Sequence, residues 1–188
     1  MTDKLHILAF AGSLRKDSYN RKVLKLAEEL LPEGISYEIF DLIDVPLFNV
    51  DVEKQGWPES VAAFRNAIRK ADALLIASPE YNSSITGVLK NAIDWAPRGE
   101  NGQPTPLKHK PIAVIGVGER GGTSRSQLHL KQILNHMDMY VVNKPEVLIA
   151  LKPLNPFDEE GKLEDEMAIK LIQQLLSNLV AYTLQLRK

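Results

Sequence analysis

The chain contains no cysteine, and this absence removes several kinds of chemistry. Disulfides, thiolate nucleophiles and cysteine-ligated zinc or iron–sulfur clusters are all excluded. Any redox chemistry must therefore come from a bound cofactor. The sequence also lacks an apolar run of ~18 residues and a charged leader followed by an apolar stretch. We therefore expect no membrane partner and a cytoplasmic location.

Positive charge is not in excess either. The 188 residues include 23 Lys and Arg and 24 Asp and Glu, which gives a formal net charge of −1. Proteins that bind nucleic acid usually carry a basic stripe, because neutralising phosphates supplies much of their affinity. No dense run of Lys or Arg occurs here, so we expect no nucleic acid partner. The length predicts one domain, residues 1–188, and the apolar share of 44% is ordinary for a globular protein.

Strand-like and helix-like patterns alternate along the chain. Short apolar or alternating runs predict strands at 4–10, 35–40, 73–77 and 112–115, and at 140–142 with 147–149 as one split strand. Apolar residues at helical spacing predict helices at 20–31, 58–71, 88–96, 130–137 and 168–179. Residues 42–57 are predicted to be irregular. This alternation predicts an α/β fold, a doubly wound five-stranded parallel sheet with helices on both faces.

Ligands of such sheets bind beyond the carboxyl ends of the strands, so the loops there are informative. The first loop, residues 12–20, follows a buried strand and opens a helix. Ser13, Ser18 and Asn20 offer neutral donors, Arg15 adds charge, and the free amides of the helix start point the same way. The Gly-Lys-Ser/Thr ending of a triphosphate-binding loop is absent, which favours a monophosphate. The alternative is a polar turn in which Ser18 or Asn20 is only the helix N-cap.

The second loop, residues 79–84, follows the most apolar strand. A planar ligand could lie against it, with Tyr81 giving apolar surface and backbone groups reading the edge of the ring. The alternative is a turn in which Pro79 and Asn82 serve only the backbone.

The third loop, residues 116–122, contains the pattern G-x-G-x-x-G. A dinucleotide fingerprint belongs on the first strand of its unit, whereas this pattern follows the fourth, so we do not read it as one. We expect its glycines to let the backbone approach a flat ring. The alternative is a plain glycine-rich turn.

The three loops adjoin one another if the strand order is 2-1-3-4-5, the flavodoxin-like order. A single ligand with a monophosphate at one end and a planar ring at the other would then touch all three. Flavin mononucleotide (FMN) has that shape.

Three motifs carry a family resemblance: Gly-Ser-Leu-Arg-Lys-Asp-Ser-Tyr-Asn at 12–20, Pro-Glu-Tyr-Asn at 79–82 and Leu-Lys-Asn-Ala-Ile-Asp-Trp at 89–95. With them the chain resembles the NADPH-dependent FMN reductase family, in particular its flavodoxin-like quinone, chromate and azo-dye reductases. The resemblance implies that the first loop holds the FMN phosphate, and that the second and third loops line the isoalloxazine ring. The residues it implies for FMN binding are Ser13, Leu14, Arg15, Lys16, Asp17, Ser18, Tyr19, Asn20, Pro79, Glu80, Tyr81, Asn82, Ser83, Gly116, Val117 and Gly118.

The third loop departs from the family pattern. Family members often carry small hydroxyl residues where Gly116 and Val117 stand. A hydrogen bond to the ring from this loop is therefore either missing or made by the backbone.

The resemblance implies an enzyme that passes hydride from NADPH or NADH through bound FMN to a small-molecule acceptor, such as a quinone, a flavin, an azo dye or chromate. It requires no acid–base residues and no metal, because the chemistry belongs to the cofactor. It also implies a homodimer or homotetramer. The main alternative is a non-enzymatic flavodoxin-type electron carrier. A further alternative is a nucleotide-sensing or interaction protein without turnover.

Overall fold

The computed structural model describes residues 4–99 and 105–187. Its strands form one parallel sheet in the order β2-β1-β3-β4-β5, with β6 also paired to β4, which confirms the predicted flavodoxin-like fold. The strands are β1 (His6–Ala11), β2 (Ser36–Phe40), β3 (Ala73–Ala77), β4 (Pro111–Gly118), β5 (Tyr140–Val141) and β6 (Val147–Ala150).

The fifth position of the sheet is divided between two short strands. β5 pairs with the first residues of β4, and β6 pairs with its last four residues. The segment between them contains Lys144-Pro145, where the sequence predicted the split. Since Pro has no N–H to give to a ladder, it is poorly suited to an unbroken strand.

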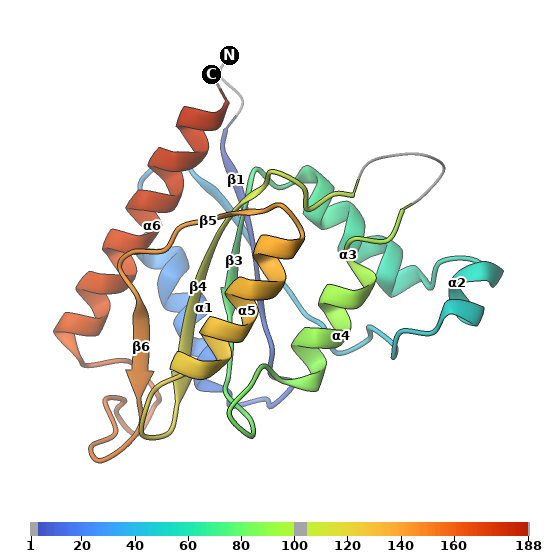
Figure 1. Cartoon of the computed structure of the whole chain (residues 1–188). Coiled ribbons are helices and arrows are strands. Elements are labelled where there is room, and N and C mark those ends of the chain that lie inside the picture. Colours follow the sequence, from blue (N-terminus) through green and yellow to red (C-terminus); the bar gives the residue numbers. More distant parts are fainter. Residues whose placement is uncertain (1–3, 100–104, 188) are drawn as a thin grey trace.

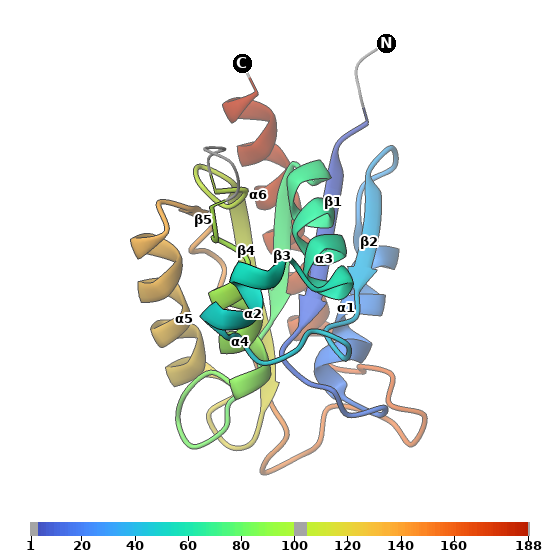
Figure 2. The same ribbon diagram turned by 90° about the vertical axis from the view of Figure 1, so that its right-hand side faces the viewer.

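Helices cover both faces of the sheet, as predicted (Figures 1 and 2). Helices α1 and α6 bury their apolar sides on one face, and α3, α4 and α5 do so on the other. Strand β3 lies between these layers and is buried at every residue, which explains its uninterrupted apolar sequence. The helices are α1 (Tyr19–Leu30), α2 (Val50–Gln55), α3 (Glu59–Lys70), α4 (Gly87–Trp95), α5 (Ser124–His136) and α6 (Glu166–Leu186).

The short helix α2 corrects the expectation that residues 42–57 are irregular. Asn49 caps it by accepting a hydrogen bond from the Asp51 N–H at 2.8 Å. None of its residues is buried, so it has no apolar stripe by which the sequence could have revealed it. Glu53 fixes α2 to the rest of the molecule by accepting a bidentate hydrogen bond from the Arg98 guanidinium, at 2.9 and 2.8 Å. This hydrogen bond holds the pKa of Glu53 below its ordinary value, although burial opposes the shift.

The two described ends of the chain meet at the amino edge of the sheet. Asp72 accepts a hydrogen bond from the His6 N–H at 2.8 Å, and the same carboxylate forms an ion pair with Arg187. One side chain therefore joins the start of β1 to the end of α6. The loops at 12–18, 79–84 and 119–123 all lie at the opposite edge (Figure 1). Among the described residues, no helix is long and apolar enough to cross a membrane.

Candidate functional site

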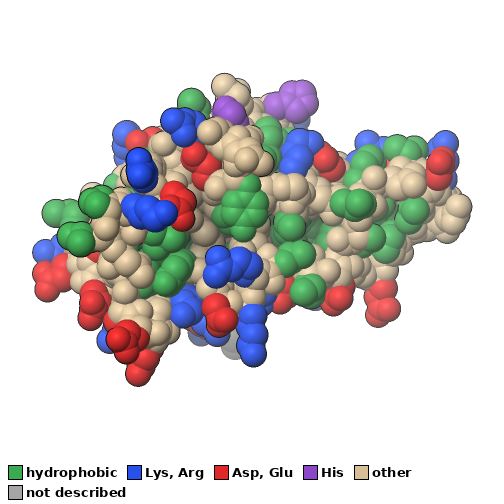
Figure 3. Space-filling model, turned by 90° about the horizontal axis from the view of Figure 1, so that it is seen from below, with side chains coloured by type: hydrophobic (Ala, Val, Ile, Leu, Met, Phe, Trp, Pro, Cys, Tyr) green, Lys and Arg blue, Asp and Glu red, His purple; other side chains and the backbone are tan. Residues whose placement is uncertain are grey.

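The carboxyl ends of β1, β3 and β4 open into one shared cleft. Its enclosed part measures about 120 Å³ and receives residues from all three predicted loops. Viewed from this edge, the surface carries side chains of both charges with apolar patches between them (Figure 3). The lining residues are Ser13, Arg15, Ser18, Tyr19, Asn20, Pro79, Glu80, Tyr81, Val117, Gly118, Glu119 and Leu151.

The start of α1 is open toward an anion. Ser18 is the N-cap residue by backbone conformation, but its side chain makes no capping bond. Within the described chain, the N–H groups of Tyr19 and Asn20 have no acceptor. Free amides at a helix N-terminus bind phosphate well, because the helix dipole adds to their donor capacity. The hydroxyls of Ser13 and Ser18 line the same cavity.

The helices that follow β3 and β4 each have a side-chain acceptor for N–H groups of their first turn. Thr86 caps α4 by accepting from the Leu89 N–H at 3.2 Å, while its hydroxyl donates to the Gly12 carbonyl at 2.6 Å. Glu80 accepts from the N–H groups of Arg125 and Ser126 in the first turn of α5, at 3.0 and 3.1 Å. Of these three helix starts, only that of α1 has no side-chain acceptor among the described residues, which leaves its first amides to a ligand's phosphate.

Asn20 has a partner that the sequence did not reveal. Its carboxamide accepts from the Val117 N–H at 3.0 Å and donates to the Val117 carbonyl at 2.9 Å. Strand β3 ends at Ala77, so the last residues of β4 have no strand neighbour on that side. The Asn20 side chain takes the place of the missing strand. It therefore fixes the first loop to the third. Of the two hydrogens on the Asn20 side-chain nitrogen, one remains for a ligand.

The loop at 79–84 is closed on itself at its tip. Tyr81 and Ser84 exchange two backbone hydrogen bonds of 3.1 Å. Between them, Asn82 and Ser83 have positive φ angles of 51° and 63°. The Tyr81 side chain is 52% exposed beside the cavity, as expected for an apolar surface that could face a ring.

The structure corrects the reason given for the glycines of the third loop. A Cβ at Gly116 would lie 2.0 Å from Thr123 Oγ1, and one at Gly118 would lie 2.1 Å from the carbonyl oxygen of Gly122. The space that a side chain would need is therefore filled by the protein itself, where α5 starts, rather than left for a flat ring. Val117 and Gly118 still line the cavity.

The predicted site residues therefore separate into two groups. Leu14, Lys16, Asp17, Asn82, Ser83 and Gly116 do not line the enclosed cavity, whereas the other ten do. The cavity also includes Glu119 and Leu151, which the prediction left out. Glu119 lies inside the third loop and could have been included on that ground. Leu151 follows the split strand, and no sequence signal points to it.

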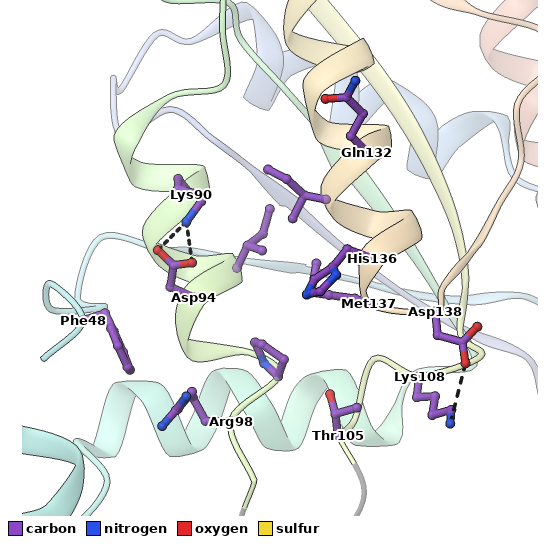
Figure 4. A pocket seen from close by; sticks show the side chains of 13 residues that line it. Phe48, Lys90, Asp94, Arg98, Thr105, Lys108, Gln132, His136, Met137 and Asp138 are labelled. Carbon is purple, nitrogen blue, oxygen red and sulfur yellow. Dashed lines mark hydrogen bonds and ion pairs between the residues drawn. The ribbon is translucent and has the colours of Figure 1, made fainter. Parts of the chain in front are cut away.

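A larger cavity lies elsewhere, between α4 and α5 (Figure 4). It measures about 930 Å³, and its wall includes Ile93, Ile133 and Met137. Ion pairs line its rim, among them Lys90 with Asp94 on α4 at 2.6 Å. It takes no residue from the three loops, so its size alone does not make it the cofactor site. Among the described residues, no group of His, Asp and Glu could hold a metal ion.

The sequence profile of the NADPH-dependent FMN reductase family matches residues 5–153, which include all three loops. The chain belongs to this family. It is 47% identical to an NAD(P)H-dependent FMN reductase of Pseudomonas aeruginosa, with the whole of both chains covered. It is 43% identical to an NADPH:quinone oxidoreductase of Arabidopsis thaliana, covering 97% of this chain and 94% of the relative.

Among solved structures, a flavoenzyme NAD(P)H:(acceptor) oxidoreductase from Paracoccus denitrificans superposes with a TM-score of 0.84 at 32% identity. That match covers 96% of this chain and 98% of the other. As a member of the FMN reductase family, the protein is an oxidoreductase with FMN as its cofactor and a reduced nicotinamide nucleotide as its electron donor.

Proposed function

We propose that the cleft holds FMN with its phosphate at the start of α1 and its ring between the second and third loops. The observation that carries this proposal is the capping pattern. Of the helices that follow β1, β3 and β4, only α1 has no side-chain acceptor, within the part of the chain that the structure describes, on the N–H groups of its first turn. The donors present fit a phosphate: the Tyr19 and Asn20 amides, two serine hydroxyls, and the Arg15 side chain at the cavity wall.

When bound, FMN would supply the hydride chemistry, and the protein would bind and orient the reactants. Tyr81 offers an exposed apolar surface at one wall of the cleft. Val117 and Gly118 also line the cleft, and Asn20 holds them in place by bonding both backbone groups of Val117. With one shared place for donor and acceptor, reduced nicotinamide would have to leave before the acceptor enters. Double-reciprocal kinetic plots should then give parallel lines.

For the acceptor we propose a small quinone, because the relatives include enzymes named for quinone reduction. Free flavin, azo dyes and chromate also accept electrons from reduced flavin, so they should be tested as acceptors beside the quinone. Relative kcat/KM for a matched set of these compounds, with NADPH and NADH each as donor, tests the assignment. A quinone that ranks below the other acceptors would contradict it.

The first experiment is the visible spectrum of the purified protein with added FMN, before and after NADPH, without oxygen. We expect a bound-flavin spectrum that bleaches on reduction. Bound flavin that neither NADPH nor NADH bleaches would point instead to an electron carrier. Absence of flavin binding would refute the placement of the cofactor.

We further propose that the cavity between α4 and α5 is where two copies of the chain meet. It has an apolar centre and a rim with both signs of charge, so one copy can face another across a twofold axis (Figure 4). Light scattering should give a mass of at least twice the 21.0 kDa chain. The charge-introducing variant Gln132→Glu, at the same cavity, should weaken the association. A monomeric wild-type protein would contradict this proposal.

A further inference from the structure

Glu80 belongs to the Pro-Glu-Tyr-Asn motif, yet its carboxylate is engaged with a helix start. One oxygen, Oε2, accepts from both the Arg125 and Ser126 N–H groups. The other, Oε1, lies 3.5 Å from the Arg125 guanidinium. The side chain is only 16% exposed. Negative charge at a helix N-terminus is favourable because the helix dipole and the free amides both attract it.

A second set of bonds joins the same two segments. The Ser126 hydroxyl donates to the Pro79 carbonyl at 2.8 Å and lies 2.7 Å from the Ser78 hydroxyl. Ser78 and Ser126 are both fully buried. The base of the second loop is therefore fixed to the first turn of α5 by side chains from both partners.

In the described structure, the tip of the second loop has only exposed side-chain bonds to α5, from Arg125 to the Ser83 hydroxyl at 3.4 Å and between the Ser84 hydroxyl and His129 Nδ1 at 3.0 Å. Asn82 and Ser83 occupy the left-handed region, a conformation that persists only where surrounding contacts determine it. Past the base, the backbone bonds at the tip run only between Tyr81 and Ser84, within the loop itself. Helix α5 follows the third loop directly, so the first turn that holds Glu80 is continuous with the part of the cleft formed by that loop.

We propose that Glu80 is a positioning residue, which sets the separation of the two walls of the cleft by clamping the second loop to α5. It acts through the loop and the helix and needs no contact of its carboxylate with the flavin. The expected effect of Glu80 on FMN binding rests on the proposed function. The clamp itself can be measured in the protein without cofactor.

The experiment compares Glu80→Ala with a matched control, Asp165→Ala. Asp165 also accepts two helix-start amides with one oxygen, from Met167 and Ala168 at 2.9 and 3.0 Å, but it caps α6 and lines no part of the cleft. Both variants lose a capping carboxylate of the same kind. A difference between them therefore reports on the cleft rather than on helix capping.

In the cofactor-free protein, Glu80→Ala should speed amide hydrogen exchange at Tyr81 and Ser84 at least tenfold, and Asp165→Ala should not. In FMN titrations followed by flavin fluorescence, Glu80→Ala should raise Kd at least tenfold, while Asp165→Ala stays within twofold of wild type. Glu80→Gln retains an acceptor oxygen but loses the charge, and should raise Kd about threefold. It takes the place of Glu80→Ala if that variant does not fold.

Unchanged exchange at Tyr81 and Ser84 would overturn the clamp, whatever happens to FMN. Faster exchange with an unchanged Kd would overturn its role in positioning the cleft. A wild-type protein that binds no FMN would instead refute the proposed function, and the exchange rates would still decide whether Glu80 holds the loop.

Discussion

The bond between Asn20 and Val117 allows a sharp test of how the cleft is held together. Asn20→Ala removes a carboxamide that is 5% exposed and leaves both backbone groups of Val117 without a partner. Each orphaned buried group costs about 1–3 kcal/mol. Because the cavity beside Val117 can admit water, we take the lower half of the combined range, about 2–4 kcal/mol. For a chain of this length, that lowers Tm by about 4–16 °C.

Urea unfolding of the cofactor-free protein, followed by circular dichroism, measures the loss. The control is Asn178→Ala, since Asn178 also donates to a backbone carbonyl, that of Lys144 at 3.0 Å, but does so at the surface. We expect the control to lose less than about 0.5 kcal/mol. A loss below about 1 kcal/mol for Asn20→Ala, or one equal to the control, would refute the view that its carboxamide replaces a strand.

The variant Asn20→Asp adds a pH dependence with a definite sign. At neutral pH its second oxygen would face the Val117 carbonyl, and this repulsion, with burial, should raise the folded-state pKa above the unfolded value of about 3.9. Below the folded-state pKa, the carboxyl group introduced in this variant is protonated and can donate to the Val117 carbonyl as the amide does. The gap in stability to wild type should therefore narrow as the pH falls from 7 toward 4, and a gap that widens would contradict the geometry.

Two further substitutions test other parts of the fold. Gly116→Ala should lower the free energy of unfolding by more than about 3 kcal/mol or prevent folding, because its Cβ would collide with Thr123. The control Gly87→Ala, whose Cβ would have no neighbour within 4 Å, should leave this free energy unchanged or raise it in the same urea assay. Glu53→Gln should cost about 0.5–1 kcal/mol at pH 7 by removing the bond from Arg98. Since the pKa of Glu53 is lowered in the folded protein, this pair stabilises above pH ~4.3 and loses its effect as the pH falls through the folded pKa, so the two unfolding curves should converge in acid.

The strand order and the meeting of the three loops could be predicted, because both follow from regular features. An apolar run such as Ala73–Ala77 marks a strand covered on both faces, and parallel strands place their following loops at one edge. The family motifs then matched a site whose walls come from those loops. Helix α2 was missed for the opposite reason, since no buried face gives its residues a periodic pattern.

The roles of single residues in the cleft could not be read from the sequence. Glu80 and Ser126 are 46 residues apart, and Asn20 and Val117 are 97 apart. Nothing local to either residue encodes such a bond. The glycines of the third loop were assigned to a ligand because their spacing resembles a binding fingerprint. Only the packed position of Thr123 shows that the protein itself needs the space.

Because the start of β1 and the end of α6 meet at Asp72, the protein can be permuted or fused to a partner at that edge of the sheet. His6 and Arg187 contact one carboxylate at the edge of the sheet away from the cleft (Figure 1). A short linker from the end of α6 to the start of β1, with new ends opened in a surface loop, should therefore give a circular permutant with the same sheet. A fusion partner or an electrode attached at either end would leave the cleft facing outward, accessible to donor and acceptor.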